Sequence, residues 1–193
     1  MIPPLNQAGV LPPYLTNIGP TKSDAMSPYK TNIKELVSRF AVTPKRIDIV
    51  KGLINYRQLL RKEGIVDGFQ WIDGSYVERC EERLNRSPND VDVVTFAYRP
   101  QNYKDDGKWG LFVKQKEDII FNRRIIKQLY ACDAFYEDLS LPGKVIVSRA
   151  RFWFGLFSHQ RSTFLWKGLL EIPLQADDND ALTPLNGGTK NAS

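Results

Sequence analysis

Two aspartates in the middle of the chain have the spacing of a metal site. Asp90 and Asp92 flank a single apolar residue in the run NDVDVVTF. Side chains alternate along a β-strand, so both carboxylates would project from one face, with Val91 on the other. Two carboxylates on one face can bind a hard divalent cation such as Mg²⁺ through oxygen. Alone, such a pair is also common at ordinary strand ends, so it needs support from its surroundings.

That support comes from a glycine–serine pair just upstream. In WIDGSY, an apolar strand ends at Asp73 and is followed by Gly74 and Ser75. Glycine lacks a Cβ, so its backbone can approach a phosphate closely. A helix that begins at Ser75 would add unpaired amides and a favourable dipole for an anion. The order of strand, Gly-Ser, helix and Asp-x-Asp strand therefore predicts a metal–phosphate site.

This order resembles the signature of the nucleotidyltransferase superfamily of the DNA polymerase beta type. Residues 71–94 carry the resemblance, as WIDGS followed by DVDVV. Over residues 2–174 the chain also looks like a bacterial family of minimal nucleotidyltransferase-like proteins, through IPPL, GVLPP, PNDVDVV and SHQRSTFLWKGLLEIPL. One departure is that 14 residues separate Ser75 from Asp90, slightly more than is usual in the superfamily.

The resemblance implies a third carboxylate on a later strand. Asp133, in YACDAFYEDL, is the best match, and Glu137 and Asp138 are the competing candidates. A buried, unpaired carboxylate is costly. Asp133 should therefore either face Asp90 and Asp92 from a neighbouring strand, or lie at a sheet edge in a salt bridge with a residue such as Arg123 or Arg149.

A triphosphate also needs cationic partners, and Arg161 and Lys167 in the late segment are the candidates. Ordinary surface charge is the alternative for both. The single histidine, His159, is more typical of a surface or capping residue than of a ligand. Trp153, Phe154 and Phe157 have the helical spacing of core residues, although they could stack a base.

The resulting hypothesis is an enzyme that binds Mg²⁺ or Mn²⁺ through Asp90, Asp92 and Asp133. It would transfer a nucleoside monophosphate from a nucleoside triphosphate, held by Gly74, Ser75, Arg161 and Lys167, to a hydroxyl of a protein or RNA. A small chain leaves acceptor choice to a partner protein encoded nearby, in a toxin–antitoxin or antiviral defence setting. The alternatives are a catalytically silent binding module, and an RNA-binding protein that uses the basic residues of 45–62 and 149–167.

Composition supports a globular chain of this kind. The 193 residues are 42% hydrophobic and carry a net charge of +5, which suits an anionic partner without requiring one. Only two cysteines are present, without metal-site spacing, so a reducing cytoplasm is expected. No signal peptide and no apolar run long enough to span a membrane is seen.

The pattern along the chain predicts an α+β (α/β) fold, with a small mixed sheet flanked by helices. We expect a proline-rich strap over residues 1–42, a nucleotidyltransferase-like domain over 43–175 and a disordered tail over 176–193. A free N-terminal tail is the alternative to the strap. The expected strands are 69–73, 91–96, 130–135 and 165–174. The expected helices are 44–64, 76–84, 114–129 and 145–158, and a polar loop is expected at 101–110.

Overall fold

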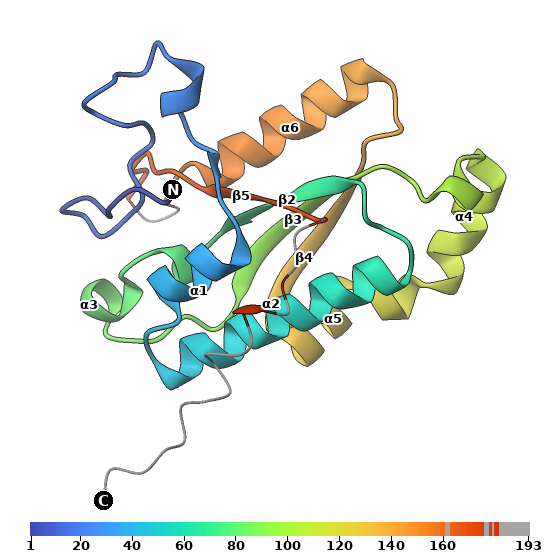
Figure 1. Cartoon of the computed structure of the whole chain (residues 1–193), viewed down its shortest axis with the longest axis horizontal. Helices are drawn as coiled ribbons and strands as arrows, with labels where there is room; N and C mark the ends of the chain where they lie inside the picture. The colour runs from blue at the N-terminus through green and yellow to red at the C-terminus, as the bar shows by residue number, and fades with distance from the viewer. Residues whose placement is uncertain (161–162, 176–177, 179, 182–193) are drawn as a thin grey trace, which may run out of the picture.

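A five-stranded mixed β-sheet forms the centre of the molecule (Figure 1). The computed structural model describes residues 1–160, 163–175, 178 and 180–181. The strand order is β1-β5-β2-β3-β4. The β2 strand pairs antiparallel with β3 and β5, whereas β3–β4 and β1–β5 are parallel. The strands are Tyr29–Lys30 (β1), Gly68–Asp73 (β2), Val91–Ala97 (β3), Cys132–Asp138 (β4) and Leu170–Pro173 (β5). The predicted α+β class with a mixed sheet is confirmed.

Helices cover the two faces of the sheet unequally (Figure 1). Three helices, α1 (Ile33–Phe40), α2 (Pro44–Lys62) and α5 (Arg123–Tyr130), lie on one face, and α6 (Gly143–Phe157) lies on the other. Strand alternation explains the two cores. Val91, Val93 and Ala97 pack in the larger cluster beside α2, whereas Val94 and Phe96 pack against Trp153 of α6.

Helix α2 begins where the sequence predicts. The Thr43 side chain accepts a hydrogen bond from the Arg46 amide, and Pro44 occupies the first turn, where its missing N–H costs nothing. Its interior supplies Ile49, Leu53 and Leu60, which are fully buried.

The helix predicted at 76–84 is interrupted. A 3₁₀ turn (Ser75–Val77) and the short α3 (Cys80–Leu84) replace it. Arg46 explains the break, because its buried guanidinium donates to the carbonyl oxygens of Tyr76 and Glu78 at 2.6 Å each. Those carbonyls are therefore occupied by a side chain of another helix.

Two other predictions in the middle of the chain are wrong. The expected loop at 101–110 contains a 3₁₀ turn (Gln101–Tyr103) and the start of α4 (Asp106–Gln115), which Asp105 caps through the Lys108 amide. The single helix expected at 114–129 is divided into the end of α4, a π-helical turn (Glu117–Phe121) and α5. Side-chain capping by Asp105 and Asn122 decides these boundaries.

The terminal segments both contact the domain. Ile2, Val10 and Leu11 are buried, and α1 lies within the predicted strap. Most of the predicted disordered tail lies outside the described residues. Of its described residues, Asp178 is fully buried and accepts a hydrogen bond from Arg57 Nε at 2.7 Å.

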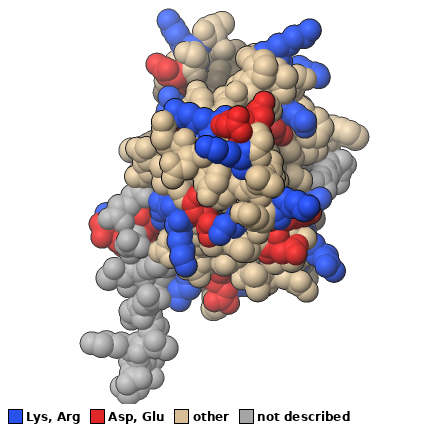
Figure 2. Space-filling view, turned by 90° about the vertical axis from the view of Figure 1, so that its right-hand side faces the viewer, with Lys and Arg blue, Asp and Glu red and all other residues tan. Residues whose placement is uncertain are grey.

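The molecular surface carries both signs of charge. On the face shown in Figure 2, basic and acidic side chains are interspersed and no region of one sign dominates. Among the described residues, no helix combines the length and the apolar character needed to cross a bilayer.

Candidate active site

Three aspartates lie side by side across three neighbouring strands. In the register of the sheet, Asp92 of β3 is the partner of Asp73 on β2 and of Asp133 on β4. Adjacent strands are only about 4.8 Å apart, so strand pairing alone brings these carboxylates together. Asp90 immediately precedes β3, two residues before Asp92, and adds a fourth acid to the row.

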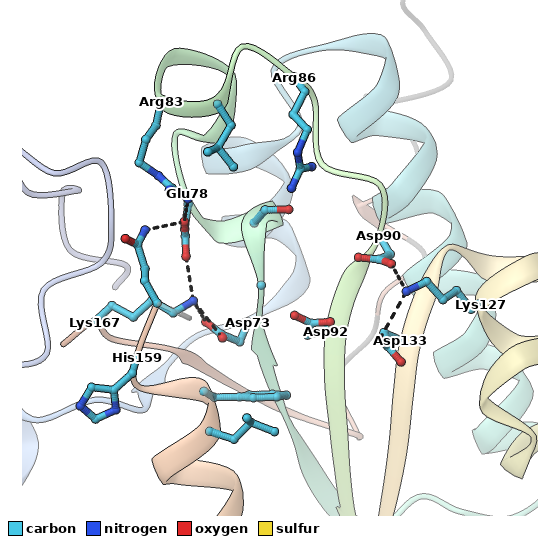
Figure 3. Close-up of a pocket in the computed structure, with 16 residues that line it drawn as sticks. Asp73, Glu78, Arg83, Arg86, Asp90, Asp92, Lys127, Asp133, His159 and Lys167 are labelled. Atoms are coloured by element: carbon cyan, nitrogen blue, oxygen red, sulfur yellow. Dashed lines mark hydrogen bonds and ion pairs between the residues drawn. The ribbon is translucent and has the colours of Figure 1, made fainter. Parts of the chain in front are cut away.

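The row belongs to the face of the sheet that α6 covers. Because side chains alternate along a strand, Asp92 projects from the same face as Val94 and Phe96, which pack on α6. Asp133 and Phe135 likewise share that face. Helix α6 does not extend over this end of the sheet. The uncovered end forms an open pocket of about 330 Å³, in which Asp92 lies between Asp73 and Asp133 (Figure 3).

Asp92 is the least neutralised member of the cluster. No hydrogen bond or ion pair joins its carboxylate to another described residue. Burial, followed by repulsion from Asp73, Asp90 and Asp133, raises its pKa to about 6. A carboxylate in this position gains stability from any cation or proton that reaches it.

Lys127 of α5 bridges two other acids of the cluster. Its Nζ lies 2.5 Å from Asp90 Oδ2 and 3.4 Å from Asp133 Oδ2, so these two oxygens are at most about 6 Å apart. Hydrogen bonding and attraction by Asp90 raise the pKa of Lys127, which keeps it charged. An ammonium group thus lies between two carboxylates at the position where the sequence predicts a metal ion.

Arg123, one turn before Lys127 on α5, also binds Asp133. Its Nη2 donates to Asp133 Oδ2 at 2.6 Å, and its Nε donates to Oδ1. Burial alone would raise the pKa of Asp133, but the hydrogen bonds from Arg123 and the charge of Lys127 outweigh it and hold the pKa below its usual value. Both alternatives for Asp133 are therefore realised, because it faces Asp92 from the edge strand and also forms the salt bridge with Arg123.

A second ion-pair system lies on the opposite side of Asp92. The buried Lys167 Nζ contacts both Asp73 oxygens at 2.9 Å and Glu78 Oε1 at 2.8 Å. Although burial opposes its charge, Asp73 and Glu78 raise the pKa of Lys167. Glu78 also accepts hydrogen bonds from Gln160 and Arg83. Predicted as a phosphate ligand, Lys167 instead serves here as an internal counter-charge.

Gly74 is required by the packing of the site itself. Its φ is +84°, a left-handed conformation that favours glycine, and a Cβ there would lie 2.5 Å from Asp92 Oδ2. Ser75 lines the pocket, but it begins only the three-residue 3₁₀ turn. The expected long helix, with its dipole directed at a phosphate, is absent at this position.

The remaining candidate site residues from the sequence differ in whether they line the pocket. Glu137 and Asp138 lie at the far end of β4, where they accept hydrogen bonds from Trp153 and Arg99. They do not line the pocket. His159 does line it, with its Nδ1 3.1 Å from Ser158 Oγ. Arg161 lies outside the described residues.

The donor set suits a hard divalent cation, since carboxylate oxygens are its preferred ligands. Within the described part of the chain, however, no group of three or more acidic, histidine or cysteine side chains is arranged as a ready metal site. Lys127 and Arg123 already engage Asp90 and Asp133 through ion pairs. Asp92 and Asp90 would be the first ligands, with Asp133 joining if its cations move.

Sequence reasoning named Arg123 as a salt-bridge partner of Asp133, but it missed Lys127 and the role of Asp73. Arg123 and Lys127 are four residues apart, so they share one helix face, and α5 leads directly into the strand that carries Asp133. That spacing was an available signal. Asp73 precedes Gly74 directly, but only the pairing of β2 with β3 places it beside Asp92.

A match to a known protein family covers nearly the whole chain. A family model matches residues 3–173, a range that contains every side chain of the pocket. The chain belongs to the family of unknown function DUF6932. No curated protein and no solved structure matches it. The DUF6932 match therefore spans the sheet, α6 and the carboxylate cluster as one unit.

Proposed function

We propose that this chain is a metal-dependent nucleotidyltransferase, which transfers a nucleoside monophosphate from a nucleoside triphosphate to an acceptor hydroxyl. The observation that carries the proposal is the convergence of Asp90, Asp92 and Asp133 in one open pocket beside Gly74 and Ser75. The resemblance of residues 71–94 to the nucleotidyltransferase superfamily supports it. The pocket volume also lies in the range of about 300–1,000 Å³ typical of small-ligand sites.

Each group has a distinct part in this proposal. Asp92 and Asp90 would hold Mg²⁺ or Mn²⁺, and Asp133 would complete the acidic wall. When bound, the metal would neutralise the phosphate oxygens and favour ionisation of the attacking hydroxyl. The Ser75 hydroxyl and the guanidinium of Arg86, which has no carboxylate partner among the described residues, are placed to contact phosphate. Lys167 and Arg83 together balance the charges of Asp73 and Glu78, so the unbalanced negative charge is that of Asp92.

The chemical step follows from in-line displacement at phosphorus. The acceptor oxygen forms a bond to the α-phosphorus, the bond from that phosphorus to the β-phosphate oxygen breaks, and pyrophosphate leaves. The hydroxyl proton passes to one of the clustered carboxylates. Asp133 is a weak base while Arg123 binds it, because its pKa is held low. For Asp133 to take the proton, Arg123 would first have to release it.

The ion pairs of Lys127 favour a second candidate, a nucleotide-binding module without turnover. An ammonium group that stays between Asp90 and Asp133 would exclude a metal bridging those two residues. Such a module would act through a partner protein, as an antitoxin or a regulatory subunit. For both candidates we place the action in the cytoplasm, with the two buried cysteines as free thiols.

Metal-dependent consumption of labelled nucleotides separates these candidates. The purified protein is incubated with Mg²⁺ or Mn²⁺ and each α-labelled triphosphate, alone, with RNA and with cell extract. We expect label transfer and pyrophosphate release, both lost in Asp92→Ala and kept in Asp48→Ala, an exposed aspartate of α2. Nucleotide binding without any transfer would favour the silent module, and full transfer by Asp92→Ala would refute the site.

A further inference from the structure

The outward face of α6 and the turn after it expose large apolar side chains. Val147 is 69% exposed, Phe152 is 54% exposed and Phe164 is 82% exposed. Leu156 and Trp166 are also exposed. Single exposed apolar residues are common, but several on one helix and the turn after it indicate a contact surface. We call the exposed side of α6 from Lys144 to Leu156 the α6 surface.

Charge on this part of the chain has a single sign. Residues 143–170 contain Lys144, Arg149, Arg151, Arg161 and Lys167, and no aspartate or glutamate. Their net charge of +5 equals that of the whole protein, whereas both signs are interspersed on the face in Figure 2. Arg149 and Lys167 contact carboxylates, but Lys144 and Arg151 have no ion pair among the described residues. The α6 surface itself carries Lys144, Arg149 and Arg151 and no acidic residue, so it is positive.

The basic and apolar residues of the α6 surface alternate around the helix. At 100° per residue, Lys144 and Arg151 lie near the middle of the exposed face, with Val147 on one side and Phe152 on the other. Charges in the middle oppose insertion into a lipid bilayer or a dry protein interface. An exposed aromatic ring, Phe152, beside cations instead suits a single-stranded nucleic acid, whose bases stack on the ring while its phosphates pair with the cations.

Gly155 adds an independent observation on the same face. It lies in the last turns of α6, where glycine is a poor helix former, and a Cβ there would meet no other atom within 4 Å. Packing within the protein therefore does not require glycine at this position. A backbone or phosphate of a ligand could approach the helix closely here.

The α6 surface leads to the carboxylate cluster. Leu156, Phe157 and His159, at the end of α6, line the same pocket as Asp92 and Asp133 (Figure 3). A strand bound along α6 would thus have one end at the acids. The next turn displays Phe164 with a left-handed φ of +56°, which phenylalanine rarely adopts.

We infer that the α6 surface binds a single-stranded polynucleotide, and that a terminal hydroxyl of this strand is the acceptor of the transfer. The second clause rests on the proposed function, but the binding itself does not. The strand contacts Arg151 and Lys144 through phosphates and Phe152 through a base. Its backbone passes over Gly155 towards the pocket.

Binding is measured by fluorescence anisotropy with a labelled 20-nucleotide RNA strand, in EDTA and without nucleotide. We expect Phe152→Ala and Gly155→Leu each to weaken binding about tenfold, in the range observed for loss of one stacked base. Leu111→Ala, which removes a similarly exposed side chain on α4, should leave it unchanged. Gly155→Ala reports on folding, because it should keep or raise the melting temperature.

A salt titration measures the electrostatic contribution to RNA binding. Two cationic contacts predict a slope of log affinity against log salt of about −1.4 for a single strand, and Arg151→Gln should halve it. Wild-type affinity weaker than about 0.1 mM would overturn the inference, as would equal affinity of Phe152→Ala and Gly155→Leu to wild type. Sedimentation with anionic lipid vesicles that depends on Phe152, without RNA binding, would assign the surface to membranes and also overturn it. RNA binding without nucleotide transfer would leave the surface standing and refute only the proposed activity.

Discussion

Replacing Asp92 with asparagine should stabilise the metal-free protein at neutral and alkaline pH. Asparagine has nearly the same shape, and Asp92 has no hydrogen bond or ion pair with a described residue to lose. The change therefore removes mainly a charge that burial and three neighbouring acids disfavour. A substitution that abolishes metal binding while raising stability is the signature expected of a functional, electrostatically strained group.

The magnitude follows from the shift in the pKa of Asp92. The fold raises it from 3.8 to about 6, and each pKa unit corresponds to about 1.4 kcal/mol, so the ionised form costs about 3 kcal/mol. Because the folded pKa is the higher one, wild-type stability falls as pH rises from about 4 through about 6, and the full cost applies above that range. The gain in Asp92→Asn should be fully present at pH 8 and absent near pH 4.

Thermal and urea unfolding in EDTA at pH 4, 6 and 8 measure this gain. At pH 8 we expect the melting temperature of Asp92→Asn to exceed that of wild type by roughly 6–12 °C. Mg²⁺ should then stabilise wild type but not the variant, by mass action. Asp133→Asn is the matched control and should not stabilise, because it leaves Arg123 without its partner. A variant that is no more stable than wild type at pH 8, or a gain that persists at pH 4, would refute the reasoning.

Three further predictions test the surrounding contacts. Lys127→Met removes the ammonium that competes with a metal ion for Asp90, so the affinity for Mn²⁺ should rise about 5–30-fold. Electron paramagnetic resonance measures this affinity, and an unchanged or weaker affinity would contradict the competition. Gly74→Ala should lower the free energy of unfolding in urea by at least about 1 kcal/mol, because the new Cβ meets Asp92. In an Asp92→Ala background the loss should be distinctly smaller, and equal losses would rule out the clash. Arg57→Met leaves Asp178 buried without its main partner and should cost about 3–5 kcal/mol; a loss below about 1 kcal/mol would show that the pair is dispensable.

Much of the local structure follows from the sequence because its causes are local. Thr43 and Pro44 predict the start of α2 through capping chemistry between neighbouring residues. Strand alternation places Asp90 and Asp92 on one face without knowledge of any other strand. The strands at 69–73 and 91–96 likewise correspond to β2 and β3. The failed prediction at 76–84 depends on a distant contact, because Arg46 of α2 takes the carbonyls that a continuous helix would use.

The composition of the site was decided by strand pairing. The sequence contains Asp73, Asp92 and Asp133, but their alignment depends on the register between β2, β3 and β4, which no local pattern encodes. The same holds for Lys127 between Asp90 and Asp133, and for Lys167, which reaches Asp73 from 94 positions away. Electrostatic energy depends on distance in space and on burial. The sequence therefore identified Asp90, Asp92 and Asp133 as candidate ligands of a cation, and only the tertiary structure decided which of them are already neutralised and which one, Asp92, is not.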